Sequence, residues 1–172
     1  VTILGLGALG TACAQALVTL DFDVTGWSRT PKSVTGVTCL SGDVGTALNG
    51  CEIAVLLLPL TPQTKNILNA DTLSRMAKGA FILNPGRGPL IDDTALLNAL
   101  DSGQIAHATL DTFRVEPLPA DHAYWAHPNV TVTPHIASAT RPAAAARVIA
   151  ENIRRGESGH PFLHLVDRSN GY

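Results

Sequence analysis

Short apolar runs alternate with longer amphipathic runs along the chain. Apolar runs of strand length occupy residues 1–4, 24–27, 37–40, 53–58, 80–83, 107–110 and 130–133. Runs with helical spacing occupy residues 8–20, 43–48, 63–68, 71–76, 92–100 and, as the longest, the Ala-rich 140–155. Such alternation is typical of parallel βαβ units rather than hairpins. The sequence therefore predicts an α/β fold, a doubly wound parallel sheet of six or so strands.

Two of the predicted helices carry signals at their ends. Asp92 or Asp93 can accept a backbone N–H at the start of the 92–100 helix, and Gly103 can end it. For the last helix we expect Thr140 as the N-cap, Pro142 in the first turn and Gly156 at the end.

A glycine-rich loop joins the first predicted strand to the first predicted helix. Gly5, Gly7 and Gly10 stand in a G-x-G-x-x-G pattern, in which they permit a tight turn, close approach of a pyrophosphate, and close packing of helix and strand. The positive end of the helix favours phosphates. The alternative is a glycine-rich turn that binds no ligand. The pattern predicts a dinucleotide site that includes Gly5, Gly7, Ala8, Leu9 and Gly10, within a domain spanning residues 1–156.

The end of the second predicted strand bears on which dinucleotide binds. An NAD site of this kind carries Asp or Glu there to hold the ribose 2′-hydroxyl, whereas this chain has Trp27, Ser28, Arg29 and, further on, Lys32. A guanidinium and an ammonium can bind a 2′-phosphate, with Ser28 as an added donor. The alternative is that Arg29 and Lys32 are ordinary solvated charges. The residues favour NADP over NAD.

Three polar segments directly follow predicted strands: 84–88, 111–117 and 133–138. The carboxyl ends of parallel strands meet at one edge of the sheet, so we expect the segments to converge near the glycine loop. They contribute Arg87, Glu116 and His135, whose side chains suit anion binding and proton transfer. Each residue alone could be structural, but their joint occurrence at strand ends predicts a catalytic site.

Together with the glycine loop, these segments resemble the D-isomer-specific 2-hydroxyacid dehydrogenases over residues 1–172. The resemblance implies that Arg87 binds a 2-oxo acid, that His135 is the general acid/base, and that Glu116 orients His135. It also implies that Asp111 bonds to the nicotinamide carboxamide. Further residues implied in the cofactor cleft are Leu58, Pro59, Pro85, Gly86 and Ser138.

Residues 26–29 and 166–172 are similar to the NADPH-dependent branch of this family that reduces glyoxylate and hydroxypyruvate. This implies reduction of a small 2-oxo acid to the D-2-hydroxy acid. The missing acid beside Arg29 disfavours NAD-dependent members such as 3-phosphoglycerate dehydrogenase, and Pro134 stands where formate dehydrogenases carry Gln. A non-catalytic NADP-binding module or scaffold is the alternative from a different class.

Composition limits the other classes of function. The 172 residues carry a net charge of −2, with 12 Lys and Arg, 14 Asp and Glu and no block of like charge, which disfavours nucleic-acid binding. The longest apolar stretch, residues 53–60, is far shorter than the roughly 20 residues of a membrane span. The 3 cysteines lack C-x-x-C spacing, so we expect no metal site and a reducing cytoplasm.

The family resemblance also bears on completeness and assembly. The chain lacks an initiator Met and opens within a strand, so we expect a fragment. Family members carry a substrate domain before the glycine loop, which implies that part of the substrate cleft is absent here. Residues 157–172 are then expected to form a tail that returns to that domain and exposes apolar surface from Phe162 to Val166. The family further implies a homodimer.

Overall fold

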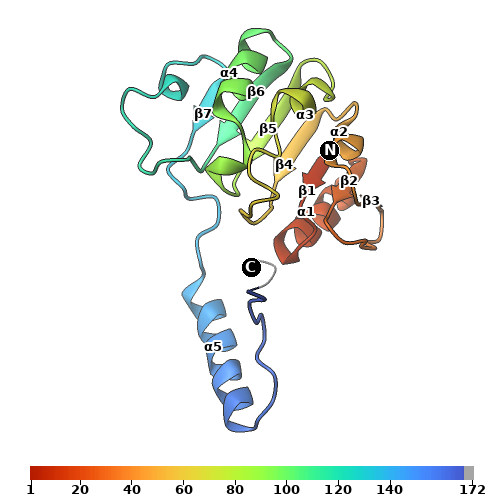
Figure 1. Ribbon diagram of the computed structural model, residues 1–172. Helices are drawn as coiled ribbons and strands as arrows, with labels where there is room; N and C mark the ends of the chain where they lie inside the picture. The colour runs from red at the N-terminus through yellow and green to blue at the C-terminus, as the bar shows by residue number, and fades with distance from the viewer. Residues whose placement is uncertain (169–172) are drawn as a thin grey trace. The chain divides into compact units, whose positions relative to one another are not determined.

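The computed structural model describes residues 1–168 and contains one seven-stranded parallel sheet (Figure 1). The strands are β1 (Thr2–Leu4), β2 (Val24–Trp27), β3 (Val37–Leu40), β4 (Ile53–Leu56), β5 (Ala80–Asn84), β6 (Ile105–Leu110) and β7 (Val130–Val132). The helices are α1 (Ala8–Thr19), α2 (Val44–Leu48), α3 (Ala70–Ser74), α4 (Asp93–Asp101) and α5 (Pro142–Glu157). Two short 3-10 helices are η1 (Gly88–Leu90) and η2 (Ala123–Trp125).

The order of the strands is β3-β2-β1-β4-β5-β6-β7, and all six neighbouring pairs are parallel. The chain builds outward from β1 to β3 and then crosses back to β4, which pairs with the other side of β1. This reversal leaves a crevice at the carboxyl ends of β1 and β4, the place where doubly wound sheets bind ligands. The predicted doubly wound α/β fold is confirmed.

Apolar side chains pack on both faces of the sheet. Ile3 and Val24 pack with Ala14 of α1 in one cluster, while Leu56 and Ile82 belong to a larger cluster that also takes side chains from α2, α3 and α4. Full burial of a Leu or Ile side chain contributes about 1.5–3 kcal/mol. The strands that carry the site are thus anchored, and the polar segments at their carboxyl ends are held on a packed frame.

The prediction of a helix at residues 63–68 is wrong, because this segment is a series of turns. The Thr64 hydroxyl donates to the Pro59 carbonyl at 2.7 Å and also accepts from the Thr61 backbone N–H at 2.8 Å. Asn66 has a left-handed φ of 54°. Thr hydroxyls that bond to nearby backbone compete with helical hydrogen bonds. The short helix predicted after it is present only as α3, Ala70–Ser74.

The predicted end signals of α4 are confirmed; for α5, Pro142 in the first turn is confirmed, whereas the Thr140 N-cap and the end at Gly156 are wrong. The Asp92 carboxylate accepts from Ala95 N at 2.9 Å, and Gly103 has φ 70° just after the helix. The N-cap of α5 is Arg141 rather than Thr140, because Pro142, which has no N–H, occupies the first turn. Gly156 lies inside the helix, which runs on to Glu157.

The chain divides into two compact units, residues 1–135 and the part from Ile136 onward. The first contains the whole sheet, and the second contains α5. Within the second unit, the chain returns along α5, since the Asn152 side-chain amide bonds to Leu163 N and O at 2.8 and 3.2 Å. The assignment of residues 1–156 to one domain and 157–172 to a tail stays a prediction.

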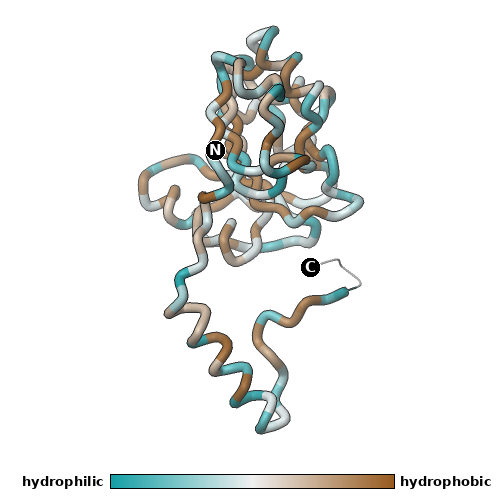
Figure 2. Tube along the Cα trace, turned by 90° about the vertical axis from the view of Figure 1, so that its left-hand side faces the viewer, coloured by the Kyte–Doolittle hydropathy of each residue, from teal (hydrophilic) through white to brown (hydrophobic). Residues whose placement is uncertain are grey.

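The second unit carries apolar side chains on its surface. Hydrophobic positions recur along α5 and the segment after it (Figure 2). Phe162, Leu165 and Val166 are 52%, 77% and 62% exposed, which confirms the apolar surface expected there. Residues 169–172, which supply part of the terminal resemblance, lie outside the described residues.

Candidate active site

The glycine loop lies between β1 and α1, and its three glycines meet different constraints. Gly5 has a left-handed φ of 111°, and a Cβ there would lie 2.5 Å from the Leu57 carbonyl oxygen. At Gly10 a Cβ would lie 1.7 Å from the Gly5 carbonyl oxygen. A Cβ on Gly7 would instead meet nothing within 4 Å. The fold therefore requires Gly5 and Gly10, whereas Gly7 leaves open space at the amino end of α1.

That open space fits a pyrophosphate. Ala8 and Leu9 begin α1, no side chain caps the helix, and Leu9 is exposed. Free N–H groups at a helix start attract anions. Leu58 and Pro59, which follow β4, lie at the same edge of the sheet because β4 pairs in parallel with β1.

The end of β2 holds a buried Trp27 and Ser28 beside exposed Arg29 and Lys32. Trp27 Nε1 donates to the Gly42 carbonyl at 3.2 Å, and the Ser28 hydroxyl donates to the Thr30 carbonyl at 2.7 Å. The Ser28 proton is thus already engaged, which leaves the two basic side chains as the groups suited to an anion here.

Asn84, which the sequence analysis did not select, shapes the turn that follows β5. It is 1% exposed, its Nδ2 donates to the Arg87 carbonyl at 3.0 Å, and its Oδ1 accepts from Gly86 N at 3.1 Å. Only glycine fits at Gly86, because a Cβ there would lie 2.8 Å from the Leu56 carbonyl oxygen. Pro85 completes the turn, and Arg87 projects from it with Nη1 bonded to the Gly86 carbonyl at 2.7 Å. An Asn before a Gly/Pro turn is the signal that could have identified Asn84.

Gly88 brings the Arg87 turn against the segment after β6. A Cβ on Gly88 would lie 2.0 Å from the Phe113 carbonyl carbon. Two backbones in such contact cannot be seen from sequence spacing. The contact places Arg87 beside the loop that carries Glu116.

Asp111 and Thr112 are both buried where β6 ends. Asp111 N donates to the Asn84 carbonyl at 3.1 Å, and Asp111 Oδ1 accepts from the Thr133 hydroxyl at 2.5 Å. Asp111 is therefore tied to β5 on one side and to β7 on the other. Among the described residues, Thr112 Oγ1 is buried without a hydrogen-bond partner.

The unpaired hydroxyl yields a stability prediction. Thr112→Val keeps the shape of the side chain and removes an unsatisfied polar atom, so we expect the free energy of unfolding to rise by about 1 kcal/mol. The melting temperature should rise by about 2–4 °C. The matched control is Thr72→Val, which should lower it, because the buried Thr72 hydroxyl donates to the Ile67 carbonyl at 2.9 Å. A lower melting temperature for Thr112→Val would contradict the prediction.

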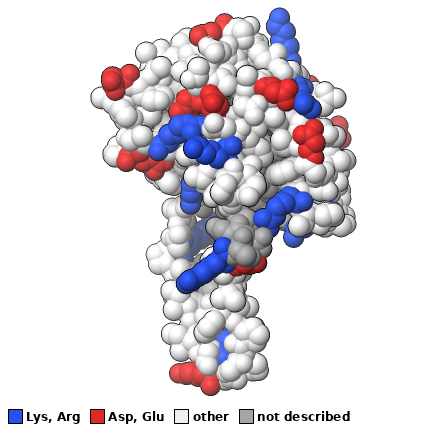
Figure 3. Space-filling model, viewed as in Figure 1, with Lys and Arg blue, Asp and Glu red and all other residues white. Residues whose placement is uncertain are grey.

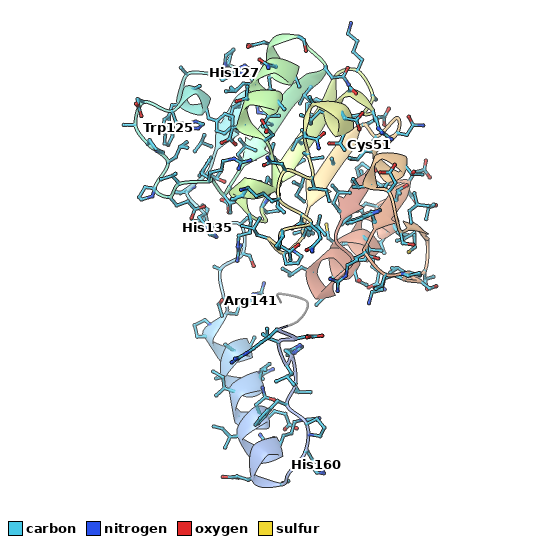
Figure 4. The ribbon with its side chains drawn as sticks, viewed as in Figure 1. Cys51, Trp125, His127, His135, Arg141 and His160 are labelled. Atoms are coloured by element: carbon cyan, nitrogen blue, oxygen red, sulfur yellow. The ribbon has the colours of Figure 1, made fainter. Side chains whose placement is uncertain are left out.

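Glu116 and His135 form a pair between the segments that follow β6 and β7. The His135 Nδ1 to Glu116 Oε2 distance is 2.8 Å, and Glu116 Oε1 accepts from Phe113 N at 2.9 Å. Figure 4 shows His135 where β7 ends. With Nδ1 bonded to the carboxylate, the ring is oriented and Nε2 is the nitrogen that can exchange a proton with a ligand.

The environment keeps Glu116 ionised. The Phe113 N–H bond lowers the pKa of Glu116 most, the His135 bond and charge lower it further, Arg87 contributes, and partial burial opposes them. The charges of Arg87 and His135 thus both act on the Glu116 carboxylate.

Arg114, which the sequence patterns also did not identify, anchors the segment that carries Glu116. Its Nε lies 3.1 Å from Asp93 Oδ2, and its Nη2 donates to Asn66 Oδ1 and to the Ile91 carbonyl. Asp93 Oδ1 also accepts from the Tyr124 hydroxyl at 3.0 Å, and this carboxylate, together with burial, raises the pKa of Tyr124. Arg114 thus links three loops behind the site.

A cavity of about 460 Å³ adjoins the Glu116–His135 pair. Its walls are mostly apolar and consist of Phe113, Glu116, Pro117, Leu118, Trp125, Val132, Pro134 and His135. Trp125 lies in the loop that precedes β7 (Figure 4). The pair therefore borders a space large enough for a small organic molecule.

The assignment of Ser138 to the cofactor cleft stays a prediction. Ser138 is exposed and belongs to the second compact unit. Over residues 1–168, no group of three or more His, Cys, Asp or Glu side chains could hold a metal ion, and no helix is long and apolar enough to cross a membrane. On the face shown in Figure 3, acidic and basic side chains lie beside one another rather than in one basic patch.

Comparison with known proteins identifies close relatives. The chain is 45% identical over 172 residues to a glyoxylate/hydroxypyruvate reductase A from Serratia proteamaculans, covering 99% of this chain and 55% of the relative. The chain spans about half the length of the curated relatives it matches.

Two solved structures extend the likeness to the fold. A D-isomer specific 2-hydroxyacid dehydrogenase from Xanthobacter autotrophicus in complex with NADPH has a TM-score of 0.96 and 52% identity, covering 100% of this chain and 72% of that one. An NADPH-dependent glyoxylate/hydroxypyruvate reductase from Sinorhizobium meliloti in complex with NADP and sulfate has a TM-score of 0.94 and 36% identity, covering 99% of this chain and 56% of that one.

The family model for the NAD binding domain of D-isomer specific 2-hydroxyacid dehydrogenases matches residues 1–137, which include the glycine loop, Arg87, Glu116 and His135. This match covers most of the chain and confirms the resemblance seen in the sequence. The chain belongs to the D-isomer specific 2-hydroxyacid dehydrogenase family.

Proposed function

We propose that the protein reduces a small 2-oxo acid of the glyoxylate or hydroxypyruvate class to the D-2-hydroxy acid with NADPH. The observation that carries this proposal is the 2.8 Å His135–Glu116 pair, at the edge of the sheet that also holds the glycine loop. The relatives named as glyoxylate/hydroxypyruvate reductases support the substrate class.

The residues present fit NADPH. Gly5, Gly7, Ala8, Leu9 and Gly10 would hold the pyrophosphate, since Gly7 is open and the helix start is uncapped. Arg29 and Lys32, with Trp27 and Ser28 behind them, would hold the 2′-phosphate. Leu58, Pro59, Pro85, Gly86, Asp111 and Ser138 complete the proposed cofactor contacts. When bound, the cofactor supplies the hydride.

Arg87 suits the substrate. Its planar guanidinium can donate to the carboxylate and the adjacent carbonyl of a 2-oxo acid, which fixes the carbonyl carbon for attack. Asn84 and Gly88 hold the turn from which Arg87 projects. The contact between Gly88 and Phe113 keeps this cation close to Glu116 and His135.

His135 suits the proton transfer. Protonated at Nε2, it can donate to the carbonyl oxygen as negative charge develops there, and it acts as general base in the reverse direction. Glu116 holds Nδ1 and orients the ring. The adjoining cavity offers space for the substrate beside His135.

The test is an NADPH and NADH titration of the purified protein, paired with its intact mass and with assays of glyoxylate and hydroxypyruvate reduction. We expect NADPH to bind more tightly than NADH and NADPH to be oxidised on addition of either acid. NADPH binding without turnover would favour a cofactor-binding module instead, and absence of binding would contradict both.

Arg29→Ala tests the choice of cofactor. We expect it to weaken NADPH binding about tenfold or more, because a charge-assisted bond to the 2′-phosphate is lost, and to leave NADH binding within about twofold. Lys65→Ala, which removes an exposed cation outside the proposed site, is the matched control. Equal losses for both cofactors would show that Arg29 does not bind the 2′-phosphate.

We also propose that the protein acts in the cytoplasm as a homodimer. The three cysteines Cys13, Cys39 and Cys51 are free thiols, which suits a reducing compartment. Sedimentation analysis of the purified protein tests the dimer.

A further inference from the structure

Thr133 lies immediately after β7 and makes three hydrogen bonds, two to the end of β6 and one to His135. Its N–H donates to the Leu110 carbonyl at 3.0 Å, its carbonyl accepts from His135 N at 3.1 Å, and its hydroxyl donates to Asp111 Oδ1 at 2.5 Å. The backbone bonds fix where Thr133 lies, so the hydroxyl has a defined direction. One residue thus touches both the segment of Asp111 and that of His135.

The bond to Asp111 is a strong one. Asp111 is 4% exposed, and a buried carboxylate is costly unless hydrogen bonds compensate for lost water. An O–H to oxygen distance of 2.5 Å is typical of a hydroxyl that donates to an ionised carboxylate. Thr133 therefore supplies a donor to the buried Asp111 carboxylate and helps to fix its rotation.

The bond between Thr133 and His135 joins two backbone atoms. His135 has a left-handed φ of 56°, which a non-glycine residue adopts only when its surroundings hold it there. The bond from His135 N to the Thr133 carbonyl closes a turn around Pro134 and so fixes the position of the His135 N–H. Because the bond uses backbone atoms, it persists when only the Thr133 hydroxyl is replaced.

We propose that Thr133 is a positioning residue that, through its hydroxyl, holds the Asp111 carboxylate as an acceptor for the carboxamide of the nicotinamide ring. The inference rests on the proposed function, which gives Asp111 this role. Without the hydroxyl, Asp111 Oδ1 loses a donor and the carboxylate turns toward other donors. The nicotinamide end of the cofactor is then held less firmly, while the adenosine end is unaffected.

The test compares two ligands on the purified protein. NADPH carries the nicotinamide, whereas 2′-phospho-ADP-ribose has the same adenosine, 2′-phosphate and pyrophosphate without it. We expect Thr133→Val to weaken NADPH binding about tenfold, equivalent to about 1.4 kcal/mol, and to leave 2′-phospho-ADP-ribose binding unchanged. Thr133→Ser, which retains the hydroxyl, should restore most of the NADPH affinity.

Thr131→Val is the matched control two residues earlier, within β7. The Thr131 hydroxyl bonds to His107 Nε2 at 2.9 Å, away from Asp111, so its loss should change the affinity for neither ligand. Circular dichroism and melting curves establish that each variant is folded. If Thr133→Val disturbs the fold, the Ser variant carries the test, and it should then bind NADPH nearly as well as the wild type.

The outcomes separate the inference from the function on which it rests. Equal weakening of both ligands by Thr133→Val, or no weakening of NADPH, would overturn the role of Thr133. Wild-type protein that binds neither ligand would contradict the proposed cofactor site itself, and the inference would fall with it. Weakened binding of NADPH alone, reversed by Ser, supports the role.

Discussion

Replacing His135 with Asn should lower the turnover of 2-oxo acids by about 10²–10⁴-fold. The expectation follows from the geometry, since Glu116 holds Nδ1 at 2.8 Å and leaves Nε2 as the proton donor. Asn is the appropriate replacement because it tolerates the left-handed φ of 56° and its amide can still donate to Glu116. The variant therefore keeps the local structure and loses only the transferable proton.

The measurement is the steady-state rate of glyoxylate reduction with NADPH, taken across a range of pH. The wild-type rate should vary with pH as expected of a reaction with a general acid, whereas the residual rate of His135→Asn should lack this dependence. NADPH affinity should be unchanged. His127→Asn is the matched control, because His127 also bonds to a carboxylate, Asp101 Oδ1 at 3.3 Å, but lies at the opposite end of β7. Near-normal turnover of His135→Asn would remove His135 from the acid/base role.

Sequence patterns predicted the residues at the strand ends because a parallel sheet brings all carboxyl ends to one edge. Arg87, Glu116 and His135 each follow a strand, so alternation of strands and helices was enough to group them. The pattern could not give the contacts between these segments. The contact of Gly88 with Phe113 and the bonds of Arg114 to Asp93 and Asn66 depend on tertiary packing, which leaves no periodic signal.

The incorrect secondary-structure predictions have local physical reasons. Residues 63–68 form no helix, because the hydroxyls of Thr61 and Thr64 bond to nearby backbone and favour turns. Thr140 is a good N-cap residue by type, but Pro142 fixes the first turn one position later. At residues 63–68 the Thr hydroxyls favour turns over a helix. At the start of α5 the proline ring decides which residue is the N-cap.

Gly7→Ala should abolish detectable NADPH binding, with a loss of affinity of about 100-fold or more, while the protein still folds. Gly7 has an ordinary φ of −76°, and a Cβ there would meet nothing within 4 Å, so the protein itself does not require glycine. The empty space is at the amino end of α1, where a pyrophosphate must approach the backbone. An added methyl group would occupy that space.

Melting curves and NADPH titrations distinguish this effect from unfolding. Ala is a poorer N-cap than Gly, so we expect the melting temperature of Gly7→Ala to fall by only a few degrees. Gly10→Ala is the contrasting variant, because its Cβ would lie 1.7 Å from the Gly5 carbonyl oxygen and should destabilise the fold itself. A folded Gly7→Ala variant that binds NADPH with wild-type affinity would contradict the placement of the pyrophosphate at this loop. Loss of binding with the fold intact would mean that Gly7 is needed for the cofactor rather than for the chain.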